Sequence, residues 1–130
     1  MFSPKTLERL AAEHIIWMTT VSPSGKPQSS PVWFLWDGSV IWVYSLDPTQ
    51  RLGNIAANPR VSLNLNSDDA GSNIVTIEGT ATVVVDAPQS YEVPEYLARY
   101  RDRMDPWGGP EGFAAKYPAA IEITPTRVRQ

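Results

Sequence analysis

The 130-residue chain has no cysteine and only one histidine, His14. No disulfide framework or thiolate metal site can therefore form, and a cluster of histidine ligands is excluded. No apolar run in the sequence reaches the roughly 18 residues that a membrane-spanning helix needs. The opening segment MFSPKTLERL also lacks the apolar stretch of a signal peptide. We therefore expect a soluble cytoplasmic protein with no metal centre and no membrane span.

Charge is also scarce. Charged residues make up 19% of the chain, the formal net charge is −3, and 42% of the residues are hydrophobic. A protein that binds nucleic acid through its bulk charge would be basic, so we expect no nucleic-acid partner. The length and the apolar content suit one globular domain over residues 1–130.

What the chain does have is an aromatic hairpin, PVWFLWDGSVIWVYS, at residues 31–45. Asp37-Gly38 between two apolar runs predicts a two-residue turn, which would pair Trp33 with Trp42 across the strands. Alternation then gives two apolar faces, one with Val32, Phe34, Trp36, Ile41 and Val43, and one with Pro31, Trp33, Leu35, Val40, Trp42 and Tyr44. A sheet with one wet face would not show this pattern, so we expect both faces to be covered.

The remaining pattern predicts a mainly β chain with few helices. Asp47 and Pro48 are expected to open a short helix, and Gly79 in a long strand suggests a bulge or a close backbone approach. We expect helices at 3–14, 47–59 and 90–104, a helical turn at 113–117, and strands at 15–21, 27–36, 39–45, 61–67, 74–86 and 119–130. Six strands joined mostly by short turns favour a small antiparallel barrel.

The order of these elements resembles a known family. The segments GKPQSSPVWFLWDG, NPRVSLNL, EGTATVV and ITPTRVR, spread over nearly the whole chain, are similar to the pyridoxamine 5′-phosphate oxidase-like, FMN-binding split β-barrel superfamily. The closer likeness is to its actinobacterial branch of deazaflavin-dependent oxidoreductases that use coenzyme F420. The resemblance implies a six-stranded antiparallel split β-barrel with flanking short helices. It also implies a homodimer with cofactor sites at the subunit interface, where the second hairpin face packs on the partner and on the cofactor ring.

The segment TQRLGN, residues 49–54, carries the implied phosphate site. The flavin enzymes of the superfamily grip the cofactor phosphate with a Ser/Thr-Arg-Lys sequence. Thr49 matches the hydroxyl, Arg51 matches the Lys, and Gln50 stands where the Arg would be, while Asn54 lies one helical turn on. Arg51 keeps a forked donor with permanent charge. The alternative interpretation is that Arg51 is a solvated residue on the surface of a short helix.

The strand SSPVW, residues 29–33, is where the resemblance implies contact between backbone and the planar cofactor ring. Pro31 lacks a ladder donor, so a heterocycle can take the place of a strand partner. Pyridoxamine 5′-phosphate oxidases carry an Arg near this point, where this chain has Ser29, Ser30 and Pro31. The implied cofactor-binding residues are Ser30, Pro31, Val32, Trp33, Ser45, Thr49, Gln50, Arg51 and Asn54.

We assign further residues to roles other than direct cofactor binding. The substrate pocket or a partner-subunit contact is assigned to Trp36, Trp42, Tyr44 and Trp107. Cations that can reach an anionic cofactor tail, or are plain surface charges, are Lys26, Arg60, Arg127 and Arg129. His14 is interpreted as structural and Asp68-Asp69 as a turn. No side chain is assigned as a catalytic acid or base, because the cofactor supplies hydride transfer.

The expected function is a coenzyme F420-dependent reductase acting on an activated double bond in a planar conjugated small molecule. Two alternatives stay open. The first is an FMN-binding oxidase-like protein, which the missing Arg and Gln50 disfavour. The second is a cofactor carrier or small-ligand-binding protein without turnover.

Overall fold

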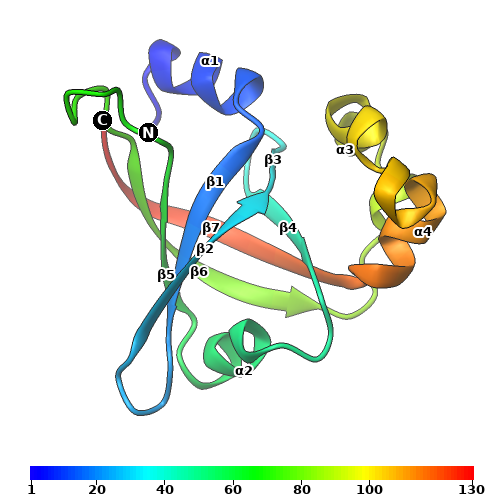
Figure 1. Ribbon diagram of the computed structural model, residues 1–130. Coiled ribbons are helices and arrows are strands. Elements are labelled where there is room, and N and C mark those ends of the chain that lie inside the picture. Colours follow the sequence, from blue (N-terminus) through cyan, green and yellow to red (C-terminus); the bar gives the residue numbers. More distant parts are fainter.

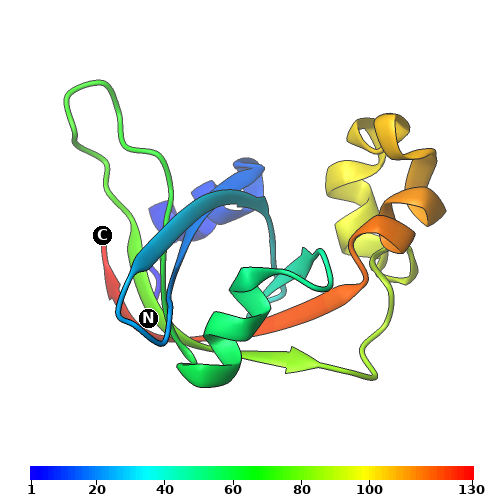
Figure 2. The ribbon, with the colours of Figure 1, turned by 60° about the horizontal axis from the view of Figure 1, so that its bottom comes forward.

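Seven strands form one antiparallel sheet in the spatial order β2-β1-β5-β6-β7-β4-β3, and this sheet curls into a half-open barrel (Figures 1 and 2). The computed structural model describes residues 1–130. The strands are β1 Ile15–Val21, β2 Pro27–Trp33, β3 Leu35–Trp36, β4 Ile41–Ser45, β5 Arg60–Asn64, β6 Thr76–Val84 and β7 Ala119–Arg129. The helices are α1 Pro4–Ala12, α2 Gln50–Ala57, α3 Pro94–Tyr100 and α4 Gly109–Lys116, with short 3-10 turns η1 Ser90–Glu92, η2 Arg101–Arg103 and η3 Asp105–Trp107. The predicted split barrel with flanking short helices is confirmed, with seven strands in place of six.

The interior of the curled sheet holds the larger hydrophobic cluster, of 15 buried residues. Alternate residues of each strand point into it, such as Ile16 and Met18 of β1 and Val61 and Leu63 of β5. Each such side chain contributes about 1.5–3 kcal/mol by leaving water. The outward residues between them are half-buried or exposed, which is the alternation expected of a sheet with one wet face.

Gly79 marks a close approach between β6 and β7. A Cβ at this position would lie 2.8 Å from the Thr124 carbonyl oxygen and 3.1 Å from Cγ2 of Ile123. The register of the two strands also shifts between Glu78 and Gly79. The predicted irregularity at this glycine is confirmed, and its cause is the neighbouring backbone.

The hairpin at Asp37-Gly38 forms, but its predicted register is wrong. The structure pairs Leu35 with Trp42 and Trp36 with Ile41, so four residues close the loop. Asp37 causes the longer loop, because its Oδ1 accepts from the backbone N–H groups of Ser39 and Val40 at 2.8 Å each. The shift is by two residues, so each side chain keeps the face predicted for it.

The second face of this hairpin is covered by the chain itself. Leu35 and Tyr44 belong to a smaller cluster of seven buried residues with Tyr96, Tyr100, Met104, Phe113 and Ala120. Trp33 stacks between the rings of Tyr100 (4.6 Å between centroids) and Phe113 (4.8 Å). The expectation that the partner subunit covers this face is therefore wrong for its centre, because α3 and α4 occupy it. We call the segment from Ser90 to Lys116 the helical cap; in Figure 1 it is the yellow-to-orange region beside the sheet.

The predicted strand 27–36 is interrupted at Phe34, which explains the extra strand. The backbone of Phe34 bonds to the helical cap: its N–H donates to the Tyr100 hydroxyl at 2.9 Å, and its carbonyl accepts from Arg99 Nε at 3.1 Å. The Tyr100 hydroxyl also lies 2.7 Å from the His14 carbonyl oxygen. The backbone groups of Phe34 are thus satisfied by α3 in place of a strand partner.

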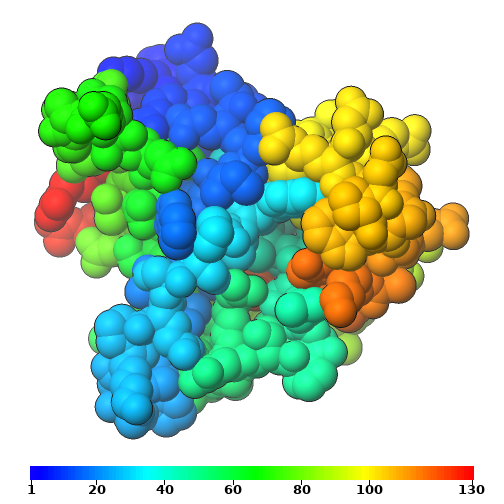
Figure 3. Space-filling model, in the orientation of Figure 1, coloured from blue at the N-terminus to red at the C-terminus, as the bar shows by residue number.

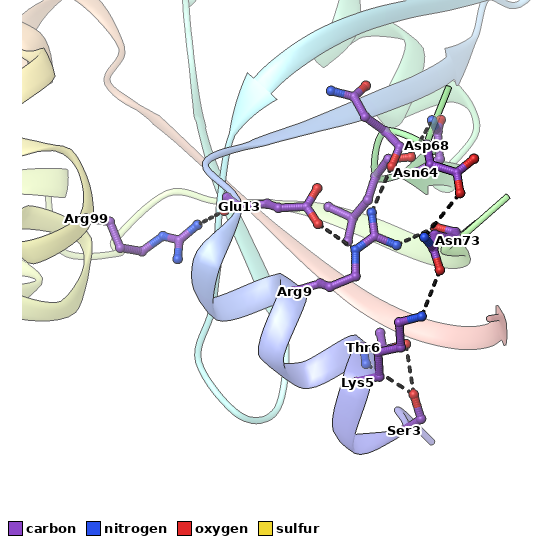
Figure 4. A network of polar contacts seen from close by, with 11 residues as sticks. Ser3, Lys5, Thr6, Arg9, Glu13, Asn64, Asp68, Asn73 and Arg99 are labelled. Carbon is purple, nitrogen blue, oxygen red and sulfur yellow. Dashed lines mark hydrogen bonds and ion pairs between the residues drawn. The ribbon is translucent and has the colours of Figure 1, made fainter. Parts of the chain in front are cut away.

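Helix α1 is fixed by two arginines (Figure 4). Arg9 pairs with Glu13 at 2.5 Å and donates to the carbonyl oxygens of Asn66 and Asn73 in the β5–β6 loop. Arg99 reaches from α3 to the other side of α1 and donates to the Glu13 carbonyl at 2.6 Å. The loop, the helix and the cap are therefore joined through side-chain contacts with backbone carbonyls.

Helix α2 begins later than predicted. Its first residue is Gln50 and its N-cap is Thr49, so Asp47 does not cap it. In Figure 2, α2 lies at the open side of the curled sheet. The helix ends at Ala57 before Asn58-Pro59, as the sequence predicted. No helix of the structure combines the length and the apolar character needed to cross a membrane.

Candidate functional site

Arg51 joins the start of α2 to the ends of two strands. Its Nη1 donates to Ser45 Oγ at 3.3 Å, and its Nη2 donates to Ser30 Oγ. The side chain is half-buried, and this burial lowers the pKa of its guanidinium. No carboxylate pairs with it, since the two ion pairs of the structure are Arg9–Glu13 and Arg127–Glu78. A partly desolvated cation without a counterion favours binding of an anion.

The start of α2 adds backbone donors to this cation. Thr49 is the N-cap, but its side chain makes no capping bond, so the amides of the first turn lack the usual side-chain acceptor. The N-terminal end of a helix also carries a partial positive charge. Arg51 sits in this first turn, so the cation and the helix end act on the same region.

Asn54 joins α2 to two strands of the sheet through side-chain hydrogen bonds. It is 1% exposed, and its Nδ2 donates to Thr20 Oγ1 at 3.0 Å and to Gln28 Oε1 at 2.8 Å. These bonds connect the helix to β1 and β2. The amide hydrogens of Asn54 are therefore used inside the protein, and its predicted role in cofactor binding stays a prediction.

An aromatic pocket of about 220 Å³ adjoins Arg51. It lies between the end of β2, the end of β4 and the helical cap, and Figure 3 views the hollowed face where cyan and teal strands meet the orange part of the cap. Its lining consists of Pro31, Val32, Trp33, Tyr44, Leu46, Arg51, Trp107, Phe113 and Tyr117. We call it the Arg51 pocket. One cation at the edge of an otherwise apolar, aromatic slot suits a planar ring that carries an anionic group.

The structure brings together most of the predicted site residues. Pro31, Val32, Trp33 and Arg51 line the Arg51 pocket, and Ser30 and Ser45 hold the guanidinium. Thr49 and Gln50 stand at the start of α2, half-buried and exposed respectively. Their role in cofactor binding stays a prediction.

The four residues assigned to substrate or partner contact divide between two places. Tyr44 and Trp107 line the Arg51 pocket. Trp36 and Trp42 lie at a different pocket, near the hairpin loop, which shares only Tyr44 with the first. These four residues therefore lie at two pockets, and their contact with a substrate or a partner subunit stays a prediction.

Sequence reasoning missed Leu46 and two aromatic residues of the Arg51 pocket lining, Phe113 and Tyr117. Their rings stack at 4.7 Å between centroids, and both contact Trp107 edge-on. A spacing of four residues between two aromatics predicts that they share one helix face. The spacing of Phe113 and Tyr117 could therefore have indicated a shared aromatic face, but it does not predict which part of the chain that face packs against.

None of the other predicted cations, Lys26, Arg60, Arg127 and Arg129, lines the Arg51 pocket. Arg127 pairs with Glu78 at 3.7 Å on an exposed face. Ser45 of β4 pairs with Ala119 of β7, and Arg127 lies eight residues further along β7, a distance of about 26 Å at the usual rise of a strand. Arg60 is exposed, and its backbone N–H donates to Asn58 Oδ1, as expected of a turn residue.

The interpretation of Asp68-Asp69 as a turn is confirmed, and that of His14 as a structural residue stays a prediction. His14 packs edge-on against Tyr100, and burial together with nearby guanidinium groups lowers its pKa. Asp68 Oδ1 accepts from the backbone N–H groups of Ala70 and Ser72, which makes it a turn residue.

Several solved structures share this fold. A solved structure of an F420 reductase is 27% identical, has a TM-score of 0.72, and the match covers 94% of each chain. A conserved hypothetical protein from Mycobacterium tuberculosis is 23% identical with a TM-score of 0.75, covering 99% of this chain and 84% of that one. A heme storage protein from Vibrio cholerae is 15% identical with a TM-score of 0.63, covering 98% and 92%. The last two likenesses show a shared fold only.

A family model described as pyridoxamine 5′-phosphate oxidase matches residues 2–130. The match spans nearly the whole chain, and the split barrel is the fold that the resemblance implied. The chain belongs to the pyridoxamine 5′-phosphate oxidase family.

Proposed function

We propose that this protein is a coenzyme F420-dependent reductase that acts on an activated double bond of a planar, conjugated small molecule. The observation that carries the proposal is Arg51, a half-buried cation with no carboxylate partner, at the start of α2 and at the edge of an aromatic pocket. The likeness to an F420 reductase at 27% identity supports the same cofactor.

The donor set fits an anionic, planar cofactor. Arg51 and the first turn of α2 would hold its phosphate, and Pro31, Val32 and Trp33 would lie along its ring. When bound, the deazaflavin supplies the hydride. The protein's own contribution is to orient the ring against Pro31, Val32 and the edge of Trp33, and to exclude water with Trp107, Phe113 and Tyr117. A proton for the product can come from water.

The size of the Arg51 pocket supports a second subunit at the site. At about 220 Å³ it is smaller than the roughly 300–1,000 Å³ of a site that encloses a drug-sized ligand. The chain would therefore hold one side of the cofactor, and a partner in a homodimer would complete the other. Sedimentation at micromolar concentration should then give twice the chain mass; a monomer that still binds the cofactor would refute this arrangement.

Cofactor choice is the first test. The phosphate segment carries one cation, Arg51, where the related flavin enzymes have two, and Gln50 stands at the second position. We therefore expect coenzyme F420 to bind at least about tenfold more tightly than FMN, which equals about 1.4 kcal/mol. Fluorescence titration with each cofactor measures the ratio. Equal or reversed affinities would favour the FMN-binding alternative.

Arg51 is the second test. A charge-assisted bond to phosphate is worth about 1.5–3 kcal/mol, so Arg51→Ala should weaken F420 binding by roughly ten- to a hundredfold. Arg51→Lys should recover much of this loss, and added salt should narrow the gap between Arg51→Ala and the wild type. Arg101→Ala is the matched control, because Arg101 is exposed on the cap and makes no ion pair. A folded Arg51→Ala variant with wild-type affinity would overturn the phosphate assignment.

Turnover separates a reductase from a cofactor carrier. Reduced F420 and a conjugated enone are mixed with catalytic amounts of protein, and cofactor oxidation is followed by absorbance. Oxidation over many turnovers supports the reductase. Tight cofactor binding without oxidation across a panel of enones would support a carrier.

A further inference from the structure

A second pocket lies on the same face of the sheet, on the other side of Tyr44. Its volume is about 330 Å³, larger than that of the Arg51 pocket. The hairpin of β3 and β4 forms one side, and the segment that leads into the cap forms the other together with the beginning of the cap. The lining consists of Leu35, Trp36, Asp37, Trp42, Tyr44, Ala87, Pro88, Val93 and Glu95. We call it the Trp42 pocket.

The aromatic walls of the Trp42 pocket are held in place by hydrogen bonds. Trp42 Nε1 donates to Asp37 Oδ2 at 2.9 Å, and Asp37 is itself fixed by two backbone N–H groups of the hairpin loop. The Tyr44 hydroxyl donates to the Pro88 carbonyl at 2.9 Å, and its ring packs edge-on against Tyr96. These rings are positioned before any ligand arrives, which reduces the entropy lost on binding.

The charges around the Trp42 pocket have one sign. Asp37 and Glu95 line it, and no Lys, Arg or His does. Glu92 is near enough to add to burial in raising the pKa of Tyr44. Arg99, one turn after Glu95 on α3, is directed away to the carbonyl oxygens of α1. Burial raises the pKa of Asp37, but the hydrogen bonds that it accepts outweigh this and lower the pKa, so the carboxylate stays charged near neutral pH.

A pocket with aromatic walls and carboxylates at its edge fits one class of small molecule. Aromatic faces attract cations through the ring quadrupole, most strongly for Trp, and the nearby carboxylates add direct attraction. An anion would meet only repulsion here, and a neutral polar molecule would leave the apolar walls without a matching surface. Trp36 lines the pocket as well, but its ring also packs against the barrel core and contacts Phe2.

We propose that the Trp42 pocket binds an organic cation, a tertiary or quaternary ammonium with an apolar body, against the rings of Trp42 and Tyr44 and beside Asp37 and Glu95. The site is separate from the Arg51 pocket except for Tyr44, and it has the opposite charge. The proposal does not rest on the cofactor assignment. It gives the chain a second ligand site, whose occupant differs in charge from any phosphate-bearing cofactor.

Choline and its uncharged carbon isostere, dimethylbutanol, provide the test, because they share a shape and differ in charge. Each is titrated into the full chain, and the indole N–H signals are followed in proton–nitrogen NMR spectra. The Trp42 signal is assigned from its loss in Trp42→Phe. We expect choline to shift this signal and to bind at least about fivefold more tightly than the isostere. Equal affinities would overturn the proposal, because they would show that the charge is not recognised.

Three variants locate the site. Glu95→Gln removes one exposed charge and should weaken choline binding about two- to fivefold. Trp42→Leu keeps an apolar residue without the aromatic face, and should abolish the preference for choline over the isostere. Arg51→Ala lies in the other pocket and should leave choline binding unchanged. If Trp42→Leu fails to fold, the Glu95→Gln variant still tests the proposal, because Glu95 is exposed. Wild-type choline affinity in Glu95→Gln would refute the assignment, and so would a changed choline affinity in Arg51→Ala.

Discussion

Arg99→Ala should cost this protein more stability than the loss of an ordinary surface arginine. Arg99 belongs to α3, but its guanidinium donates to the carbonyl oxygens of Phe34 at 3.1 Å, Ala11 at 2.8 Å and Glu13 at 2.6 Å. It also lies over the Phe34 ring, 4.8 Å from the centroid. One side chain thus joins the helical cap, the end of α1 and the break between β2 and β3.

The size of the effect follows from these contacts. A hydrogen bond to a charged group contributes about 1.5–3 kcal/mol, and a cation near a helix C-terminus adds about 0.3–1 kcal/mol. The exposed Ala11 carbonyl can return to water, so the contributions do not simply add. We expect Arg99→Ala to lower the free energy of unfolding by about 3–5 kcal/mol. For a chain of this size the melting temperature should fall by roughly 10–20 °C.

Thermal melting followed by circular dichroism measures this, with Arg101→Ala as the matched control. Arg101 is exposed and makes no ion pair, so its removal should change stability by less than about 0.5 kcal/mol. Arg99→Lys should fall between the wild type and Arg99→Ala, because an ammonium cannot reach several carbonyls with the planar fork of arginine. A melting temperature of Arg99→Ala within about 3 °C of the wild type would refute the role given to these contacts.

Three further predictions concern positions inside the fold. Gly79→Ala should lower the free energy of unfolding in urea by about 1–3 kcal/mol, because its Cβ would lie 2.8 Å from the Thr124 carbonyl oxygen. Gly53→Ala is the contrasting case: its Cβ would meet open space on α2, so it should raise the free energy of unfolding by about 0.5–1 kcal/mol. Asn54→Ala should cost about 1–3 kcal/mol by the same assay, because it leaves two acceptors of β1 and β2 without their donor. The lowered pKa of His14 means that the unfolded chain binds its proton more readily, so this residue's contribution to stability should be lost as pH falls below about 6.5. His14→Gln should flatten that part of the pH–stability curve; an unchanged slope would show that other groups cause it.

Local pattern was enough to predict the barrel. The β-branched run of β1, the alternation of β5 and the glycine at the β6 bulge each follow from rules that involve near neighbours. The hairpin at Asp37-Gly38 was predicted to exist, but its register was not, because the choice between a two-residue and a four-residue loop depended on the Asp37 carboxylate capping two amides. Arg51 was identified through the likeness of its segment to a cofactor-binding sequence.

Contacts between segments far apart in the sequence could not be predicted from local sequence patterns. The strand breaks at Phe34 because Arg99 and Tyr100, 65 and 66 residues later, bond to its backbone. Nothing in the sequence around Phe34 indicates this. The residues that cover the second hairpin face could not be predicted for the same reason. Its apolar pattern predicts that something covers it, but the pattern is the same whether the cover is the helical cap or a partner subunit.

The helical cap also explains why the outer face of β4 carries two pockets and not one. Trp33 is sandwiched between Tyr100 and Phe113, so the middle of the face is filled by packed rings. What remains open lies on either side of Tyr44: the Arg51 pocket with a cation at its edge, and the Trp42 pocket with carboxylates. Because the cap contributes walls to both, substitutions in α3 or α4 can alter ligand choice while the barrel core is unchanged. We therefore expect ligand selectivity to depend on how the cap divides the sheet face, with charge deciding which ligand each pocket accepts.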